Sequence, residues 1–345
     1  MSSSDRRTSP FRPNAKRMDA DKMSIVQVLV VSVLLIMFIA PIITNFEPSQ
    51  VISQNDNPAN LTDPAQVQPI YNYNLPASNI RIEVGEISGY SGFAYIIEAE
   101  SRLYFVDLIN DITMDIDLPV GVKANGAYLR GYDVDRDGDT EFFLRNYVNS
   151  TFYVLMVDIN DGKVSEFTMP FGYPAVQGFG DFNGDGYPDL LIQNVDNWNN
   201  FLTLDVNTNT TIGTFQSVNS AGVTVGRFTS ASEDSIALID KMETFPFTQR
   251  NITVVEGDGT QVVNNILTSP VQDLVTFNYG GGLDEIAAIQ TNGYLTVYNG
   301  LTLGAIYNES VDPLGNNTRF IETGDFNVDF QDDLVVISRD QEMAY

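Results

Sequence analysis

A unit of about 48 residues recurs over most of this chain, and this repeat restricts the possible folds more than any other feature. Each unit opens with an acidic or glycine-containing turn, followed by an apolar run such as "DLLI", an alternating segment such as "FLTLDVN" and a shorter segment such as "TIGTF". The turns open 46 to 50 residues apart, at Glu86, Asp133, Asp181, Arg227, near Phe277 and at Asp325. Four short strands joined by turns are typical of a propeller blade. We therefore predict an all-β fold, a β-propeller of four-stranded blades with about six repeats.

The length of the repeat argues against other repetitive β folds. It is too long for one coil of a β-solenoid and too short for a sandwich domain. The last turn opens at Asp325, so the third strand of that repeat would begin near Tyr345, where the sequence stops. The segment "VQPIYNYN" at 67–74 could supply a fourth strand to that blade. We expect residues 70–345 to form a propeller that is truncated at its C-terminus, with an incomplete last blade.

Three of the turns place oxygen ligands close together. In the pattern Asp-x-Asn-x-Asp-Gly-x-x-Asp, the side chains at positions 1, 3, 5 and 9 and the carbonyl at position 7 converge, and glycine at position 6 permits a left-handed conformation. Clustered carboxylates repel one another unless a hard cation lies among them, and oxygen-only ligands suit Ca²⁺. We predict two to three calcium sites, with these ligands: Asp181, Asn183, Asp185, Tyr187 (carbonyl) and Asp189; Asp133, Asp135, Asp137, Asp139 (carbonyl) and Glu141; Asp325, Asn327, Asp329, Gln331 (carbonyl) and Asp333.

The three loops match this pattern to different degrees. The loop 181–189 matches it throughout, and the loop 133–141 ends in Glu141, whose longer side chain must still reach the ion. In the loop 325–333, Phe330 replaces the glycine, and a bulky residue adopts the left-handed conformation only at a cost. An EF-hand is excluded, because position 12 is apolar in all three loops and strands rather than helices flank them. The remaining alternative is an acidic hairpin loop that is merely solvated.

Three segments precede the repeats. Residues 1–22 carry a net charge of +3, residues 23–46 carry no charge, and the rest of the chain carries a net charge of −30. A helix over 23–46 is long enough to cross a membrane, and the positive-inside rule places 1–22 in the cytoplasm. We expect a single-pass signal anchor in the cell membrane, an extracellular propeller, and a flexible, proline-containing linker at 47–69. A cleaved signal peptide is the main alternative, and a buried core helix is less favoured.

The composition excludes several classes of function. The chain has no cysteine and no histidine, which removes thiolate sites, disulfides and the commonest general base. A net charge of −27 argues against nucleic acid as a partner. The conspicuous carboxylates belong to the acidic loops, so we predict no enzymatic activity. For Trp198, the single tryptophan, packing inside a blade is the favoured role, and contact with a sugar or a protein partner is the alternative.

The stretch "GDFNGDGYPDLLI" and the blade period resemble the FG-GAP or VCBS repeat family, which includes the propeller heads of integrin α subunits. The family's Phe-Gly is present as Phe179-Gly180, whereas a clear Gly-Ala-Pro partner is missing. The resemblance covers about residues 80–345 and implies a calcium-stabilised propeller, used in many members for adhesion or recognition at a cell surface. It does not imply integrin-like ligands, because the partner subunit and its metal-binding domain have no trace here.

From these features we expect a membrane-anchored, extracellular, calcium-binding module for the recognition or adhesion of a protein or carbohydrate ligand. The alternatives are a surface enzyme that processes carbohydrate and a passive structural component of the envelope. Six Asn-x-Ser/Thr sequons follow the apolar segment and agree with an exported glycoprotein. They are at Asn60, Asn149, Asn209, Asn251, Asn308 and Asn316.

Overall fold

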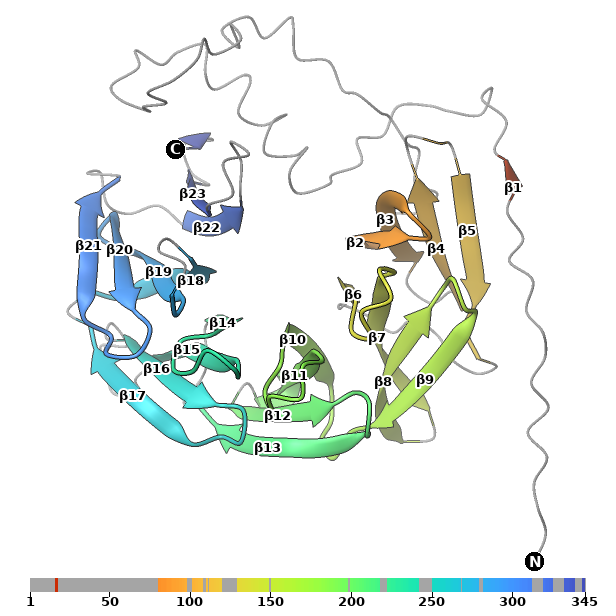
Figure 1. Cartoon of the computed structure of the whole chain (residues 1–345), viewed down its shortest axis with the longest axis horizontal. Helices are drawn as coiled ribbons and strands as arrows, with labels where there is room; N and C mark the ends of the chain where they lie inside the picture. The colour runs from red at the N-terminus through yellow and green to blue at the C-terminus, as the bar shows by residue number, and fades with distance from the viewer. Residues whose placement is uncertain are drawn as a thin grey trace, which may run out of the picture. The chain divides into compact units, whose positions relative to one another are not determined.

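The described part of the chain is built from β-strands that pair into antiparallel sheets (Figure 1). Nearly every strand bonds to the strand that follows it in the sequence, so each sheet is a meander. The computed structural model describes residues 16–17, 80–97, 101–107, 110, 112–119, 129–148, 150–197, 199–217, 222–241, 250–267, 269–278, 282–311, 319–324, 332–338 and 343–344. The strands divide between two compact units, with β1–β9 in unit 1 and β10–β24 in unit 2.

Unit 1 holds two sheets, in the orders β1-β5-β4-β3-β2 and β6-β7-β8-β9. The first strands of the two meanders, β2 and β6, contact each other. The strands are β1 (Lys16–Arg17), β2 (Ile80–Ile87), β3 (Tyr90–Ile97), β4 (Arg102–Asp107), β5 (Ile112–Asp117), β6 (Leu129–Tyr132), β7 (Glu141–Val148), β8 (Thr151–Asp158) and β9 (Lys163–Thr168).

Unit 2 holds three four-stranded sheets and one sheet of three strands, and the first strands of successive sheets again contact one another. The four-stranded sheets contain β10 (Pro174–Gly180), β11 (Asp189–Asn194), β12 (Asn200–Asp205) and β13 (Thr210–Gln216); β14 (Gly222–Gly226), β15 (Ser235–Lys241), β16 (Arg250–Glu256) and β17 (Gln261–Ile266); β18 (Val271–Phe277), β19 (Glu285–Gln290), β20 (Tyr294–Asn299) and β21 (Ala305–Ser310). The three-stranded sheet contains β22 (Arg319–Gly324), β23 (Asp333–Ser338) and β24 (Met343–Ala344), and a short 3₁₀ helix, η3 (Val195–Asn197), follows β11.

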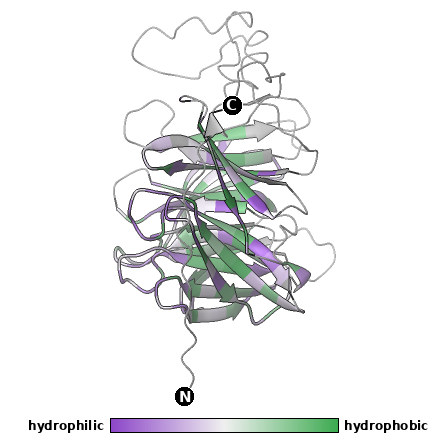
Figure 2. Cartoon of the chain, turned by 90° about the vertical axis from the view of Figure 1, so that its right-hand side faces the viewer, coloured by the Kyte–Doolittle hydropathy of each residue, from purple (hydrophilic) through white to green (hydrophobic). Residues whose placement is uncertain are grey.

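The hydrophobic core lies between neighbouring sheets, and hydrophobic residues run along the strands (Figure 2). In the four-stranded sheets of unit 2 the second strand is the most buried, and all six residues of β11 are buried. In unit 2, Leu191 and Phe201 of one sheet pack with Ile236 and Leu238 of the next. A strand covered on both faces must be apolar at consecutive positions rather than at alternate ones. This burial explains the unbroken apolar run that follows each turn in the sequence.

A recurring pair of hydrogen bonds joins neighbouring sheets within each unit, and we call it the loop clamp. The residue that opens the loop between the first two strands donates its backbone N–H to a side chain of the next sheet. The carbonyl of the loop-opening residue accepts a hydrogen bond from the backbone N–H of the residue that supplies this side chain. The clamps join Glu86 with Thr140, Asp181 with Asp234, and Arg227 with Asp284, at distances from 2.7 to 3.0 Å. At the clamp position of the loop 181–189 stands Pro188, which has neither an N–H nor an acceptor side chain.

The prediction of four-stranded repeats is confirmed, and each apolar run forms the second strand of its sheet. At Glu86 the structure differs from the expected loop, because a tight turn at Ser88 and Gly89, both with positive φ, joins β2 directly to β3. The last sheet reaches a two-residue third strand, β24. The predicted membrane segment 23–46 and the linker lie outside the described residues. Within the described residues, no helix has the length and hydropathy to be a candidate membrane span.

Candidate metal sites

The loop 181–189 connects β10 to β11 and is held by hydrogen bonds from its own backbone to its acidic side chains. The N–H of Gly186 donates to Asp181 Oδ2 (2.9 Å), and the N–H of Phe182 donates to Asp189 Oδ2 (2.9 Å). Within the loop, the N–H of Asp185 donates to Asn183 Oδ1 (2.9 Å). These bonds tie the side chains at positions 1, 3 and 9 to the backbone of the loop.

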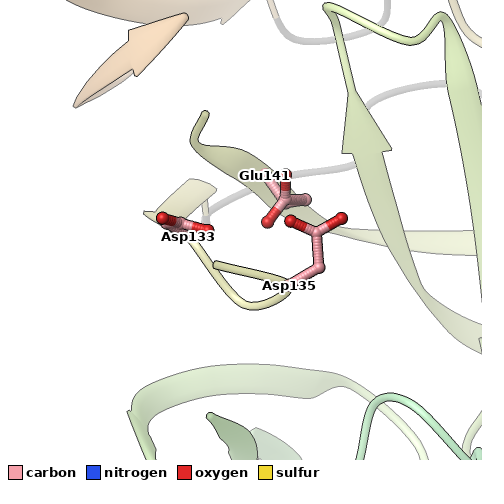
Figure 3. Close-up of side chains that lie close together, drawn as sticks. All are labelled: Asp133, Asp135 and Glu141. Carbon is pink, nitrogen blue, oxygen red and sulfur yellow. The ribbon is translucent and has the colours of Figure 1, made fainter. Parts of the chain in front are cut away.

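The loop 133–141 connects β6 to β7 and repeats this arrangement. The N–H of Gly138 donates to Asp133 Oδ2 (3.1 Å), and the N–H of Val134 donates to Glu141 Oε2 (2.8 Å). The N–H of Asp137 donates to the side chain at position 3, Asp135 Oδ1 (3.2 Å). Ligand oxygens of Asp133, Asp135 and Glu141 lie within 4.8 Å of one another, and Figure 3 shows their carboxylates gathered beside the loop. Two loops of different sequence therefore share one hydrogen-bond scheme.

Positive φ angles at positions 4 and 6 fold both loops. Gly138 and Gly186, at position 6, have φ of 93° and 91°. At position 4, Arg136 has φ of 62° and Gly184 has φ of 72°. The left-handed conformation is costly for most residues and cheap for glycine, so the glycine requirement inferred from the sequence pattern is confirmed at position 6.

One oxygen at position 1 of each loop has no partner. Asp133 Oδ1 and Asp181 Oδ1 are buried and accept no hydrogen bond, although the other oxygen of each carboxylate does. A buried polar atom without a partner is costly, and such atoms are rare in folded proteins. Both oxygens belong to loops that already concentrate carboxylates. The donor set and the unpartnered oxygens thus fit a hard cation bound in each loop.

The carboxyl groups that close the loops have raised pKa values. Burial raises the pKa of Glu141 to about 8, against a hydrogen bond from the N–H of Val134 that lowers it. Burial, aided by the negative charge of Asp205, raises the pKa of Asp189 to about 7, against a hydrogen bond from the N–H of Phe182 that lowers it. Near neutral pH these groups are therefore partly protonated unless positive charge is supplied. A divalent cation would favour the ionised form of both groups.

Two acids near these loops were missed by the sequence analysis. Asp205, which ends β12, is 6% exposed, and its Oδ2 accepts a hydrogen bond from Asn183 Nδ2 (3.5 Å). Asp158, which ends β8, is 8% exposed, and its charge raises the pKa of Glu141. Both lie on the hairpin between the third and fourth strands, about 20 residues from the loop in sequence. The sequence signal that could have identified these two acids is the acidic residue that recurs at the end of the third strand.

The loop 227–235 keeps one backbone hydrogen bond of this scheme and has no carboxylate at positions 1, 3, 5 and 9. The N–H of Phe228 donates to Ser235 Oγ (3.3 Å), which replaces the carboxylate at position 9. Thr229, at position 3, donates to the same oxygen (3.3 Å), and the carboxylate of position 1 is replaced by Arg227. Hydroxyl groups therefore stand at positions 3 and 9 of this loop, where the acidic loops carry carboxylate or amide groups.

The structure describes only some of the other predicted residues. Asp333 begins β23, whereas Asp325, Asn327, Asp329 and Gln331 lie outside the described residues. Trp198 also lies outside them, as do the sequons at Asn60, Asn149 and Asn316.

The three described sequons differ in accessibility. Asn209 is an exposed turn residue with φ of 54°, and Asn308 is exposed on β21. Asn251 lies in β16, and its Oδ1 is buried without a partner. Asn209 and Asn308 are therefore the more accessible acceptors.

Comparison with known proteins identifies the fold. No family model matches the chain, and no curated protein matches it in sequence. Two crystal structures of BBS1N in complex with ARL6DN, soaked with mercury or with lead, match with TM-scores of 0.54 and 0.53. Each is 12% identical and covers 80% of this chain, and the match covers 79% and 80% of the respective BBS1N chains. A structure of KlHsv2 with loop 6CD replaced by a Gly-Ser linker matches at 16% identity, 80% and 81% coverage and a TM-score of 0.45. The BBS1 structures are β-propellers, and together with the four-stranded sheets they establish that this chain has the β-propeller fold.

Proposed function

We propose that this protein is a membrane-anchored β-propeller that binds calcium in its acidic loops and acts as a recognition or adhesion module outside the cell. The observation that best supports calcium binding is the buried, unpartnered Oδ1 of the position-1 aspartate in both described loops, Asp133 and Asp181. A bound cation would interact with these oxygens and would balance the carboxylates that burial otherwise drives toward protonation.

The ligands named from the sequence would hold the ion in each loop. Calcium suits them better than magnesium, because calcium accepts about six to eight oxygens in flexible geometry, whereas magnesium demands a tight octahedron and keeps its water. The bound ion would supply positive charge only. The chain's own contribution is to position the oxygens, through the backbone N–H groups of the loop, before the ion arrives.

The resemblance to FG-GAP or VCBS repeats supports the same function, since these repeats carry loops of this type in calcium-stabilised propellers. The uncharged segment 23–46, preceded by basic residues and followed by an acidic chain, supports membrane anchoring with the propeller outside. An extracellular location agrees with the accessible sequons at Asn209 and Asn308.

A protein ligand is favoured by one comparison. The BBS1N propeller was crystallised in complex with ARL6DN, so a fold of this kind does bind a protein partner. A carbohydrate ligand stays the alternative. The strongly acidic surface expected from the net charge of −27 favours a partner with a basic binding face.

Thermal unfolding of the purified chain tests calcium binding. Calcium that binds only the folded state stabilises it by mass action, by about 2.7 kcal/mol per site at one hundred times Kd. We expect a higher Tm in calcium than in chelator, and a smaller gain in magnesium. Asp185→Ala removes a central ligand and should reduce the calcium-dependent part of the shift. Asp329→Ala should reduce it less, because Phe330 already disfavours its loop.

Asp258→Ala is the matched control, because Asp258 is an exposed carboxylate in a turn outside the acidic loops. This variant should keep the full calcium-dependent shift. Identical melting curves in chelator, calcium and magnesium would show that the acidic loops are ordinary solvated hairpins, and the proposal would then be wrong.

A further inference from the structure

The loop 181–189 contains a chemically reactive pair, Asn183 followed by Gly184. Asn183 is exposed, and its Oδ1 accepts the N–H of Asp185 (2.9 Å). Gly184 has φ of 72°, and a Cβ on it would lie 3.0 Å from Cγ of the Glu233 side chain. The loop therefore places a glycine, in a left-handed conformation, immediately after an exposed asparagine.

An asparagine followed by glycine is prone to intramolecular attack, because glycine has no side chain to hinder its own amide nitrogen. The Gly184 nitrogen loses its proton to solvent base and attacks Cγ of Asn183. The bond from Cγ to Nδ2 breaks, and Nδ2 leaves as ammonia after taking a proton. Water then opens the cyclic imide at one of its two C–N bonds and gives aspartate or isoaspartate. No oxidant or enzyme is needed.

We propose that Asn183 is a site of spontaneous deamidation in the calcium-free protein, and that bound calcium protects it. The protection rests on the proposed calcium binding, in which Asn183 Oδ1 is the ligand at position 3. A bound ion would fix the side chain and the following peptide group, so the nitrogen could not approach Cγ. Conversion to aspartate would give this loop the ligand of its counterpart, Asp135, whereas isoaspartate would insert an extra methylene into the backbone and spoil the site.

The chain supplies its own internal control in the turn between β19 and β20. Asn292 is also exposed and is also followed by a glycine with positive φ, Gly293 at 84°. The N–H of Tyr294 donates to Asn292 Oδ1 (3.3 Å), as Asp185 does to Asn183 in the acidic loop. No acidic loop surrounds this pair in the described structure. Its reactivity should therefore be independent of calcium.

The test is incubation of the purified full chain at mildly alkaline pH, in chelator or in calcium chloride, with peptide mass spectrometry of both asparagines. In chelator, both peptides should gain the mass of deamidation. With calcium at one hundred times Kd, about one molecule in a hundred is calcium-free, so the rate at Asn183 should fall by up to about 100-fold. The rate at Asn292 should not change. Asp185→Ala should abolish the protection of Asn183.

The outcomes separate this proposal from calcium binding itself. If Asn183 stays unmodified in chelator, the modification site is wrong, whatever Asn292 does and whatever calcium does to the Tm. If Asn183 is modified equally in both buffers while calcium still raises the Tm, calcium binds but does not protect this residue. If it is modified equally and the Tm is also unchanged, calcium binding has failed, and the claim of protection fails with it.

Discussion

Asp273 in β18 is an acidic residue whose burial has a consequence for stability. Its Oδ1 accepts the N–H of Leu274 (3.0 Å), and its Oδ2 accepts the N–H of Ile321 (3.2 Å). Burial raises the pKa of Asp273 above its ordinary value of 3.8, although both hydrogen bonds lower it. An acid with a higher pKa in the folded chain than in the unfolded chain stabilises the fold at low pH, and this contribution is lost as the pH rises through the folded-state pKa.

Asp273→Asn removes this titration and should change the pH dependence of unfolding. The Tm of the variant relative to the unchanged protein should increase as the pH rises from below 3.8 toward neutrality, when both are measured in chelator. Asp258→Asn is the control of opposite sign, because a hydrogen bond from the N–H of Thr260 lowers the pKa of Asp258. Its relative Tm should decrease over the same range. Parallel curves for Asp273→Asn and the unchanged protein would refute this role of burial.

The loop ligands could be predicted from sequence because they lie within nine consecutive residues, where spacing alone fixes their geometry. Asp158 and Asp205 were missed, since they reach the loops from another hairpin and only the fold brings them close. The unpartnered oxygens of Asp133 and Asp181 could not be predicted either, because a sequence pattern does not show which atoms are buried.

Between whole strands and sheets, the loop clamp is the recurrent polar connection. Asp234 Oδ2 accepts the N–H of Asp181 (2.7 Å), and the N–H of Asp234 donates to the carbonyl of Asp181 (2.8 Å). Asp234→Ala leaves a partly buried N–H without an acceptor, which should lower the free energy of unfolding by about 1–3 kcal/mol. Asp234→Asn keeps an acceptor oxygen and should cost less. Urea unfolding followed by circular dichroism measures both variants.

Glu233→Ala is the matched control for this clamp, because it removes the adjacent carboxylate, which is exposed. Its effect should stay within about 0.5 kcal/mol. If Asp234→Ala and Glu233→Ala were equally mild, the clamp would be geometrically present but energetically unimportant. The repeat predicted these loops but not the clamp, because the clamping side chain varies between aspartate and threonine.

For the molecule as a whole, the repeat length predicted the blade architecture well, since a period near 48 residues with four strands fits few folds. The division into two units between β9 and β10 was not predicted. The membrane topology stays a prediction.

The absence of cysteine makes a clean test of topology possible, because one introduced cysteine is then the only thiol in the chain. If 23–46 spans the membrane, a cysteine at position 101 in the propeller should react with a membrane-impermeant maleimide on intact cells. A cysteine at position 3 should react only after permeabilisation. The variants are Ser101→Cys, at an exposed residue, and Ser3→Cys. A cleaved signal peptide would instead remove position 3 from the mature protein.

The same experiment decides between the anchor and the pairing of β1 with β5. Lys16 pairs with Thr113 and Arg17 with Ile112 of β5, whereas a span at 23–46 would leave these two basic residues on the opposite side of the membrane from β5. Six basic residues in 1–22 oppose translocation, and the acidic propeller carries no comparable cytoplasmic signal. We therefore expect position 3 to be protected in intact cells while position 101 is labelled. Labelling of both positions in intact cells would favour the β1–β5 pairing and would contradict the membrane anchor.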